Sequence, residues 1–406
     1  MSGTTQQLTS SGRFDAPSDL IAVPAEPTPK PRLQKGMTHK KLCQRIRLGH
    51  GMGHGSGYLP WLILRRNNPS PYSNQVATSM PPLRRGAYYY SRGEYHTALL
   101  LLWLGVRDLR EQFPLWPIAH PHPLDGTPGT APIQRPWSRG LLDIAREAGI
   151  DHGYEIGPGV PYVASLDLLA TAPLPGGDRL AGFSSKPIVD PTQEVDWRTL
   201  ERLELERRYT AAIDCPYFVS SSALIPKLMA GQLEVWLDAS TLYCAPHLIT
   251  WAGKFAHYLN ASLDLPINEA VLHAARTLRL TTAEAWLLFQ HCAWTQSIDI
   301  DPSRRILTSY PVRPGGRPCE TTCAGAFSEI HGHDGNDHRA GTGACRDFGQ
   351  FASSWSVSCA GSGFVPGSSH THPDSEYRPG HAGQEAKKLL RQGIFFKKAI
   401  PVEILA

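Results

Sequence analysis

The stretch "YVASLDLLATAPLPGGDRLAGFSSKPI" (residues 162–188) contains two apolar runs of strand length, separated by proline and glycine. Runs of this kind on either side of a turn signal are typical of a β-hairpin. Because alternate side chains of a strand share a face, Ser184 and Lys186 should point the same way. Asp167, on the first strand, can face that side as well. The sequence therefore predicts a hairpin that gathers a carboxylate and a lysine.

Segments on both sides of this hairpin predict a mixed α/β fold. Periodic apolar residues favour helices over residues 88–105, 138–150 (with Gly149 placed to end it) and 196–212 (with an i,i+4 pair between Glu204 and Arg208). Further strands are predicted over residues 106–118 and 217–222. Residues 39–64 should form a short basic helix, a glycine-rich loop and an apolar strand, and residues 66–86 a loop.

Composition divides the 406 residues into four parts. Residues 1–36 are rich in Ser, Thr, Pro and Gln and are predicted to be disordered. An α/β domain over 37–222 is followed by helical periodicity over 223–312. That second domain ends in an alternating pair of strands at 298–312, which suits a winged helix. Residues 313–406 form a low-complexity tail, also predicted to be disordered.

Bulk properties exclude a membrane protein and favour a cytoplasmic one. The longest apolar run, "ALLLLWLGV" (98–106), is too short to span a bilayer and ends in charge. A formal net charge of +4 is compatible with binding DNA. Six cysteine and histidine residues near the C-terminus suggest either a zinc site or part of a disordered tail. Their spacing matches no known zinc finger, which favours the disordered tail. They are Cys319, Cys323, His331, His333, His338 and Cys345.

Three residues follow the order of a PD-(D/E)xK nuclease core: Glu94, then Asp167, then Lys186. Two carboxylates can hold Mg²⁺ or Mn²⁺, which prefer oxygen ligands, and the backbone carbonyl of Ser185 can complete the coordination. Such a metal lowers the pKa of a water, and the lysine orients that water or supports negative charge on the phosphate. The alternative is a strand that ends in a solvated lysine beside a buried or capping aspartate.

Several longer motifs resemble the TnsA family of transposition endonucleases. These are "RIRLGHGMGHGSGYLPWL" (45–62), "VRDLREQFPL" (106–115) and "TLERLELERRYTAA" (199–212), and they occur in the family's order. The resemblance places the catalytic glutamate at Glu94, the metal-binding aspartate at Asp167 within "SLDLL", and the family's Gln-x-Lys-Pro at 184–187. It thus implies a restriction-endonuclease-like fold.

One departure from the family concerns the metal site directly. Ser184 stands where the family usually has Gln, and where wider relatives have Asp or Glu. A serine hydroxyl is short and neutral, so Ser184 would be a weak ligand that reaches the metal through a water. The glycine-rich loop lacks the Lys-Ser/Thr of a P-loop. It can be a phosphate cradle or a lead into the next strand.

The resemblance also implies an activity and partners. The chain would hydrolyse the non-transferred strand, near the 5′ ends, of double-stranded DNA at transposon termini. It would act in the bacterial nucleoid with a DDE transposase (TnsB-like) and an AAA+ regulator ATPase (TnsC-like). Arg45, Arg47 and Arg85 are candidates for DNA contacts. Three rival functions stay open: a catalytically inactive structural subunit, a stand-alone nuclease of the same superfamily, and a DNA-binding regulator without enzymatic activity.

Overall fold

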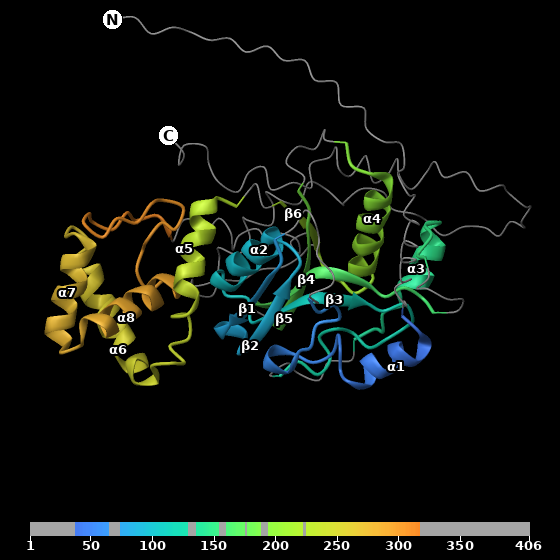
Figure 1. Ribbon diagram of the computed structural model, residues 1–406, viewed down its shortest axis with the longest axis horizontal. Helices are drawn as coiled ribbons and strands as arrows, with labels where there is room; N and C mark the ends of the chain where they lie inside the picture. The colour runs from blue at the N-terminus through green and yellow to red at the C-terminus, as the bar shows by residue number, and fades with distance from the viewer. Residues whose placement is uncertain are drawn as a thin grey trace, which may run out of the picture. The chain divides into compact units, whose positions relative to one another are not determined.

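The computed structural model describes residues 37–64, 74–128, 135–153, 160–174, 177–187, 194–221 and 225–316. The predicted N-terminal tail, the tail beyond residue 316 and the candidate zinc ligands lie outside these residues. The described part is a mixed α/β protein, as predicted, and its elements are labelled in Figure 1.

The main sheet has the strand order β3-β4-β5-β6. Its strands are β3 (Asp108–Leu115), β4 (Ala164–Leu174), β5 (Gly177–Ser185) and β6 (Tyr217–Ser220). The predicted hairpin is confirmed, since β4 pairs antiparallel with β5 and Leu168 lies opposite Phe183. Strand β6 joins β5 in parallel, after the chain passes through helix α4 (Trp197–Ala211). The candidate aspartate therefore lies on β4, and the candidate lysine directly follows the neighbouring strand β5.

Helices cover the two faces of this sheet. Helix α2 (Arg92–Trp103) packs with Leu168, Ala170 and Phe183 in one apolar cluster. A second cluster joins the opposite side of the sheet to α4 and to α3 (Leu141–Ala148), which ends at Gly149 in a left-handed conformation, as predicted. Among the candidate site residues, Glu94 comes from the α2 layer, and Asp167 and Ser184 come from the sheet.

Gly182 in β5 allows α4 to approach the sheet closely. A Cβ atom at this position would lie 3.0 Å from the methyl carbon of Thr210 on α4 and 3.1 Å from Leu166. Contacts this short would force the helix or the strand to shift. The glycine in "AGFSSKP" therefore sets the distance between α4 and β5, two residues before Ser184.

Two local predictions are wrong. An antiparallel hairpin of β1 (Val76–Met80) and β2 (Arg85–Tyr89) lies where residues 66–86 were predicted to be a loop, and β2 extends into the start of the helix predicted over 88–105. The two prolines between these strands form a 3-10 turn, η2 (Pro81–Leu83), that joins them instead of breaking the structure. The strand predicted before residue 64 is reduced to one bridge, between His50 and Leu59.

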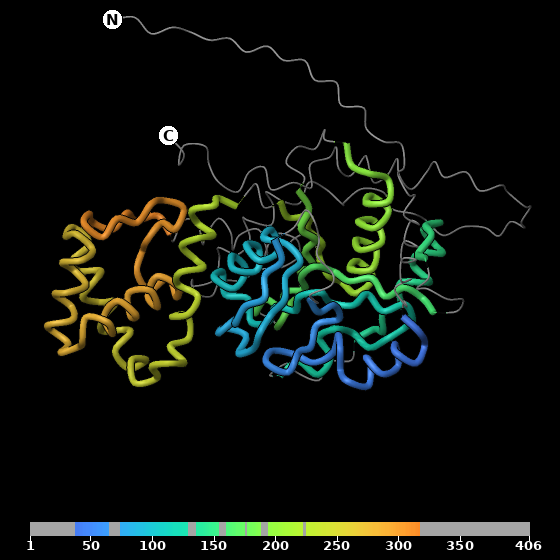
Figure 2. The backbone as a smooth tube through the Cα atoms, in the orientation of Figure 1, coloured from blue at the N-terminus to red at the C-terminus, as the bar shows by residue number. Residues whose placement is uncertain are grey.

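The glycine-rich loop is held against the β-sheet. A Cβ atom at Gly51, whose φ is +77°, would come within 2.4 Å of the Pro114 ring on β3. The loop includes the short turn η1 (Gly55–Gly57) and follows helix α1 (His39–Arg47); its course can be followed in Figure 2. Gly51 and Gly53 therefore serve close packing, and a role of the loop in binding phosphate stays a prediction.

Arg85 is an interior residue, which corrects its assignment as a DNA contact. Its guanidinium forms a bidentate ion pair with Glu111 on β3, at 2.7 and 2.6 Å. The other bonds go to the carbonyls of Gly55, Gly86 and Leu109. All five N–H donors are thus engaged within the protein. The side chains of Arg85 and Glu111 are only 7% and 0% exposed. Arg85 therefore has no N–H group left to donate to a DNA phosphate.

The remaining described residues form helices α5 (Lys227–Leu237), α6 (Ile249–Asn260), α7 (Ile267–Leu278) and α8 (Thr282–Trp294), with a short turn, η3 (Pro246–Leu248), before α6. The strand pair predicted at 298–312 is wrong: this segment has turns and one isolated bridge, Pro266 to Pro311. Asp301 accepts bonds from Ser303 and pairs with Arg304, which stabilises a turn where a strand was expected. Residues 225–316 therefore lack the wing of a winged helix.

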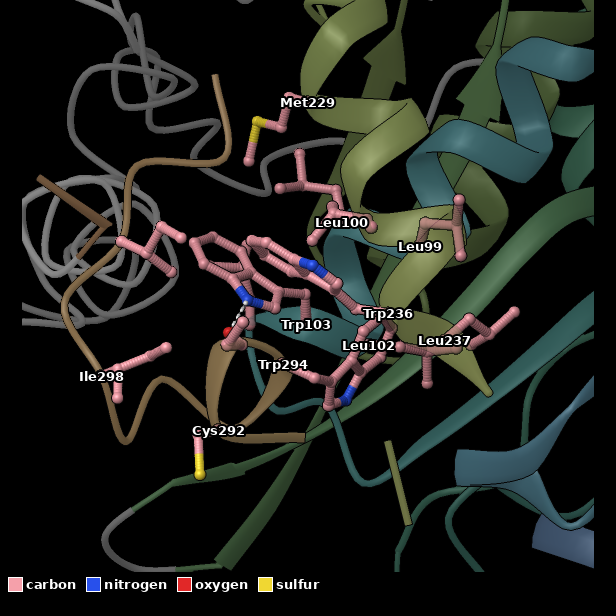
Figure 3. Close-up of a cluster of buried hydrophobic side chains, with 14 of the residues drawn as sticks. Leu99, Leu100, Leu102, Trp103, Met229, Trp236, Leu237, Cys292, Trp294 and Ile298 are labelled. Carbon is pink, nitrogen blue, oxygen red and sulfur yellow. Dashed lines mark hydrogen bonds between the residues drawn. The ribbon is translucent and has the colours of Figure 1, made fainter. Parts of the chain in front are cut away.

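Helix α2 shares its core with this helical region. Trp103 of α2, Trp236 of α5 and Trp294 of α8 are buried together (Figure 3). The Trp103 indole donates to the carbonyl of Ala293 at 3.4 Å, and Gln296 donates to the Trp103 carbonyl at 3.0 Å. The helix that carries Glu94 is therefore packed on both sides.

In the part of the chain that the structure describes, no helix has the length and apolar character of a membrane span.

We expect Arg85→Ala to lower the free energy of unfolding by about 3–5 kcal/mol, because it leaves the Glu111 carboxylate buried without its partner. Urea denaturation of the metal-free chain would measure this. The control is Arg47→Ala, at an exposed position on α1, which should change stability by less than about 0.5 kcal/mol. Unchanged stability of the Arg85 variant would contradict the role assigned to the pair.

Candidate active site

Glu94 lies in the first turn of α2, and its carboxylate is held by three donors. Ser91 caps the helix by accepting from the Glu94 amide, and its hydroxyl donates to Oε1 at 3.1 Å. The Tyr90 amide and the Gln112 side-chain amide donate to Oε2, at 3.0 and 3.1 Å. A carboxylate in the first turn also interacts favourably with the helix dipole. The local sequence "YSRGE" therefore fixes this side chain.

Asp167 and Lys186 meet at the end of the β4–β5 hairpin. The Asp167 Oδ2 atom accepts from the Ser185 amide at 2.8 Å and from the Lys186 ammonium at 3.3 Å. The Lys186 backbone amide donates to Ser220 on β6, which anchors the residue beyond the strand end. Burial lowers the pKa of Lys186, but the carboxylates of Asp167 and Glu206 outweigh that effect, so the pKa is raised and the ammonium stays charged.

The two candidate metal-binding carboxylates influence each other. Burial raises the pKa of Glu94, the negative charge of Asp167 raises it further, and the result is about 8 in place of 4.5. Hydrogen bonds from Tyr90 and Ser91 act in the opposite direction without cancelling this. Repulsion between neighbouring buried carboxylates is relieved when a cation binds between them. Glu94, Asp167 and Lys186 thus lie within electrostatic reach of one another.

Glu206 is a site residue that the sequence analysis missed. Its side chain reaches from α4 to β5 and accepts a short hydrogen bond from the Ser184 hydroxyl and a 2.7 Å bond from the Tyr217 hydroxyl. Burial raises the pKa of Glu206, Lys186 lowers it, and Asp167 raises it. A third carboxylate therefore lies beside Ser184.

The sequence did contain a signal for Glu206. On α4, the buried residues Leu203, Glu206 and Tyr209 are spaced three apart, so the glutamate falls within the apolar stripe of the helix. A charged residue at such a position is buried and needs partners. The neighbouring Glu204 differs, because Arg207 and Arg208 bind it and lower its pKa against the effect of burial.

Gln112 is the second missed residue. It lies within β3 with φ at +48°, a left-handed conformation that costs a residue with a Cβ about 1–2 kcal/mol. Its side chain is buried, donates to Glu94, and accepts from the Ser165 hydroxyl at 3.0 Å. The motif "REQFPL" thus contributes a hydrogen bond to the candidate catalytic glutamate.

The ligands available suit a magnesium-type ion. Among the described residues, no three His, Cys, Asp or Glu side chains are grouped so that they could enclose a metal. Mg²⁺ does not require such a cage, because it commonly binds through one or two carboxylates while keeping waters and substrate oxygens. Glu94 and Asp167 could supply those carboxylates, and the Ser185 carbonyl stays a predicted ligand. Ser184 is a poor candidate ligand, because its hydroxyl donates to Glu206.

The two other candidate DNA contacts lie on α1. Arg47 is exposed, and the Arg45 guanidinium lies 4.6 Å from the centre of the Trp61 ring. Their contacts with DNA stay predictions.

We expect Glu94→Gln to stabilise the metal-free chain at alkaline pH. The pKa of Glu94 is higher in the folded chain, about 8, than the ordinary 4.5. The folded wild type therefore loses stability, relative to the variant, as pH rises through this interval. The difference should grow from near zero at pH 4.5 to the order of 2–4 kcal/mol above pH 8. Thermal unfolding in chelator would measure it.

The matched control for this prediction is Glu269→Gln, an exposed glutamate in the first turn of α7. It removes one charge without altering a buried carboxylate. An equal gain in both variants, or no dependence on pH in the Glu94 variant, would contradict the assigned electrostatics.

Comparison with known proteins agrees with the resemblance seen in the motifs. No protein-family model matches the chain. The chain is 27% identical to the transposon Tn7 transposition protein TnsA of Escherichia coli over 227 residues. The matched region covers 55% of this chain and 72% of that protein. The chain is thus similar to a transposition protein over slightly more than half of its length.

Proposed function

We propose that this chain is the endonuclease subunit of a Tn7-like transposase with a PD-(D/E)xK-type site. The observation that carries the proposal is the meeting of Glu94, Asp167 and Lys186 around the β4–β5 strand end, in a chain similar to TnsA. The reaction would be hydrolysis of one phosphodiester bond on the non-transferred strand, at the 5′ ends of the transposon. The restriction-endonuclease-like fold is part of the same proposal.

Glu94 and Asp167 would hold Mg²⁺ or Mn²⁺. When bound, the ion would lower the pKa of a water and neutralise charge on the scissile phosphate. Lys186 is charged and held by Asp167, so its ammonium can orient the water or stabilise the developing negative charge. The side chain of Lys186 is 21% exposed and that of Asp167 is 17% exposed, which leaves both open to a substrate.

Glu206 would supply a carboxylate beside Ser184. It lies in the segment 199–212 that resembles the TnsA family, so it would accompany the family's longer side chain as well as this serine. That longer side chain would have to fit where the Ser184 hydroxyl meets Glu206, in a place with no exposed surface. An active enzyme and a structural subunit are therefore separated by mutation of these two residues.

Double-stranded DNA at the transposon ends, a DDE transposase (TnsB-like) and an AAA+ regulator (TnsC-like) would be the partners. The similarity to a Tn7 transposition protein supports this set. The DDE subunit would cut the other strand and join the 3′ ends to target DNA.

We expect strand-specific nicking of DNA that carries the element's own ends. The assay uses strand-labelled DNA, the partner transposase with its own active site disabled, and Mg²⁺ or Mn²⁺. Nicks should appear on the 5′ strand and fall at least about 100-fold in Asp167→Ala and Lys186→Ala. Assembled complexes without nicks in either metal would contradict the proposal and favour a structural or DNA-binding role. Nicking that needs no partner would favour a stand-alone nuclease.

We expect the roles of Ser184 and Glu206 to separate by mutation. Ser184→Ala should keep nicking within about 10-fold of wild type, because Glu206 keeps its bond from Tyr217, whereas Glu206→Gln should lower it at least about 100-fold. Ser184→Gln should lower stability, since overpacking a buried site costs about 1–3 kcal/mol. Restored or increased activity in Ser184→Gln would show instead that the serine marks a weakened site.

A further inference from the structure

We propose that Gln112 is a positioning residue that holds the Glu94 carboxylate in the orientation needed to bind the metal. The inference rests on the proposed function, because it takes Glu94 to be a metal ligand. It gives a role to Gln112, the third residue of "REQFPL", which is not one of the candidate catalytic residues.

The backbone at Gln112 departs from the strand around it. In the β3–β4 ladder Glu111 pairs with Leu168 and Phe113 pairs with Leu166, but the step between them, where Gln112 faces Asp167, carries no pairing. Gln112 has φ at +48°, and its carbonyl accepts from the Trp61 amide at 3.2 Å. The kink therefore lies directly across the ladder from the candidate metal-binding aspartate.

Glycine is the residue that adopts this conformation without strain. A glutamine here is strained, and its side chain must compensate through the contacts it makes. Strained backbone of this kind persists where the surrounding structure enforces it, and it is concentrated at functional sites. The side chain of Gln112, not its backbone, is thus the feature that calls for explanation.

Both ends of the Gln112 amide are used. Its nitrogen donates to Glu94 Oε2 at 3.1 Å and its oxygen accepts from the Ser165 hydroxyl at 3.0 Å. Ser165 precedes Asp167 by two residues on β4, so the amide links the helix that carries one carboxylate to the strand that carries the other. Gln112 is 3% exposed, and this burial keeps water from competing for either bond.

The chemistry of an amide suits this task. It offers a donor to a carboxylate without adding a charge, whereas lysine or arginine would compete with the metal for Glu94. The donors to Oε2, from Gln112 and Tyr90, leave Oε1 bound by the Ser91 hydroxyl alone. The arrangement therefore fixes one oxygen and leaves the other more accessible to a cation. Such supporting hydrogen bonds commonly change metal affinity about 10- to 100-fold.

The test separates backbone strain from the side-chain contact. Gln112→Gly removes both, and Gln112→Ala removes only the contact. Arg279→Gly is the matched control, because Arg279 has φ at +55° and is exposed at the end of α7. Free Mn²⁺ would be titrated into the metal-free full chain and followed by electron paramagnetic resonance, and urea unfolding would be measured on the same samples.

Both Gln112 variants should bind Mn²⁺ about 10-fold more weakly or worse than wild type. The glycine variant should unfold at higher urea than the alanine variant, so that affinity does not follow stability. Arg279→Gly should leave Mn²⁺ affinity unchanged. Wild-type affinity, within about 2-fold, in Gln112→Gly or in Gln112→Ala would overturn the inference while leaving the proposed function intact.

A different result would overturn the proposed function itself. If wild type does not bind Mn²⁺, or binds it equally well after Asp167→Ala, then Glu94 and Asp167 do not form a metal site. The inference about Gln112 would fall with it. The Asp167→Ala arm thus tells the two failures apart.

Discussion

Strand β3 lies in the interior, with four charged or amide side chains among its eight buried residues. Buried polar groups must find partners, and here several of them draw a different neighbour to the strand. Glu111 binds Arg85 of the β1–β2 hairpin, Gln112 joins α2 to β4, and Arg110 donates to the carbonyl of Pro123. The partners of Glu111, Gln112 and Arg110 thus help to determine where the surrounding elements lie, including the helix that carries Glu94.

The carboxylates of the candidate site are held by the fold close enough to repel one another. Glu94, Asp167 and Glu206 come from a helix, a strand and a second helix, and burial raises the pKa of Glu94 and of Glu206. Lys186 offsets part of this negative charge. Three carboxylates are thus held close to one lysine, and two of them have a raised pKa. Perturbed pKa values of this kind are concentrated at functional sites.

The local part of this structure could be predicted from the sequence, and the non-local part could not. The β4–β5 hairpin and α4 follow from apolar periodicity and turn residues, and α3 ends at Gly149 as expected. The β1–β2 hairpin was missed because Pro81 and Pro82 suggested an irregular loop. Arg85 was taken for a surface residue because its partner, Glu111, lies 26 residues away. Glu206 approaches Ser184 only because α4 packs at Gly182.

The shared tryptophan core of α2, α5 and α8 also limits which segments can be exchanged between related proteins to make chimeras. A region that contributes Trp236 and Trp294 to the same cluster as Trp103 is not an interchangeable module. A chimera joined between residues 221 and 225 would pair helix surfaces shaped for different neighbours. Exchange of parts between related subunits should therefore succeed when the α/β and helical regions are transferred as one piece.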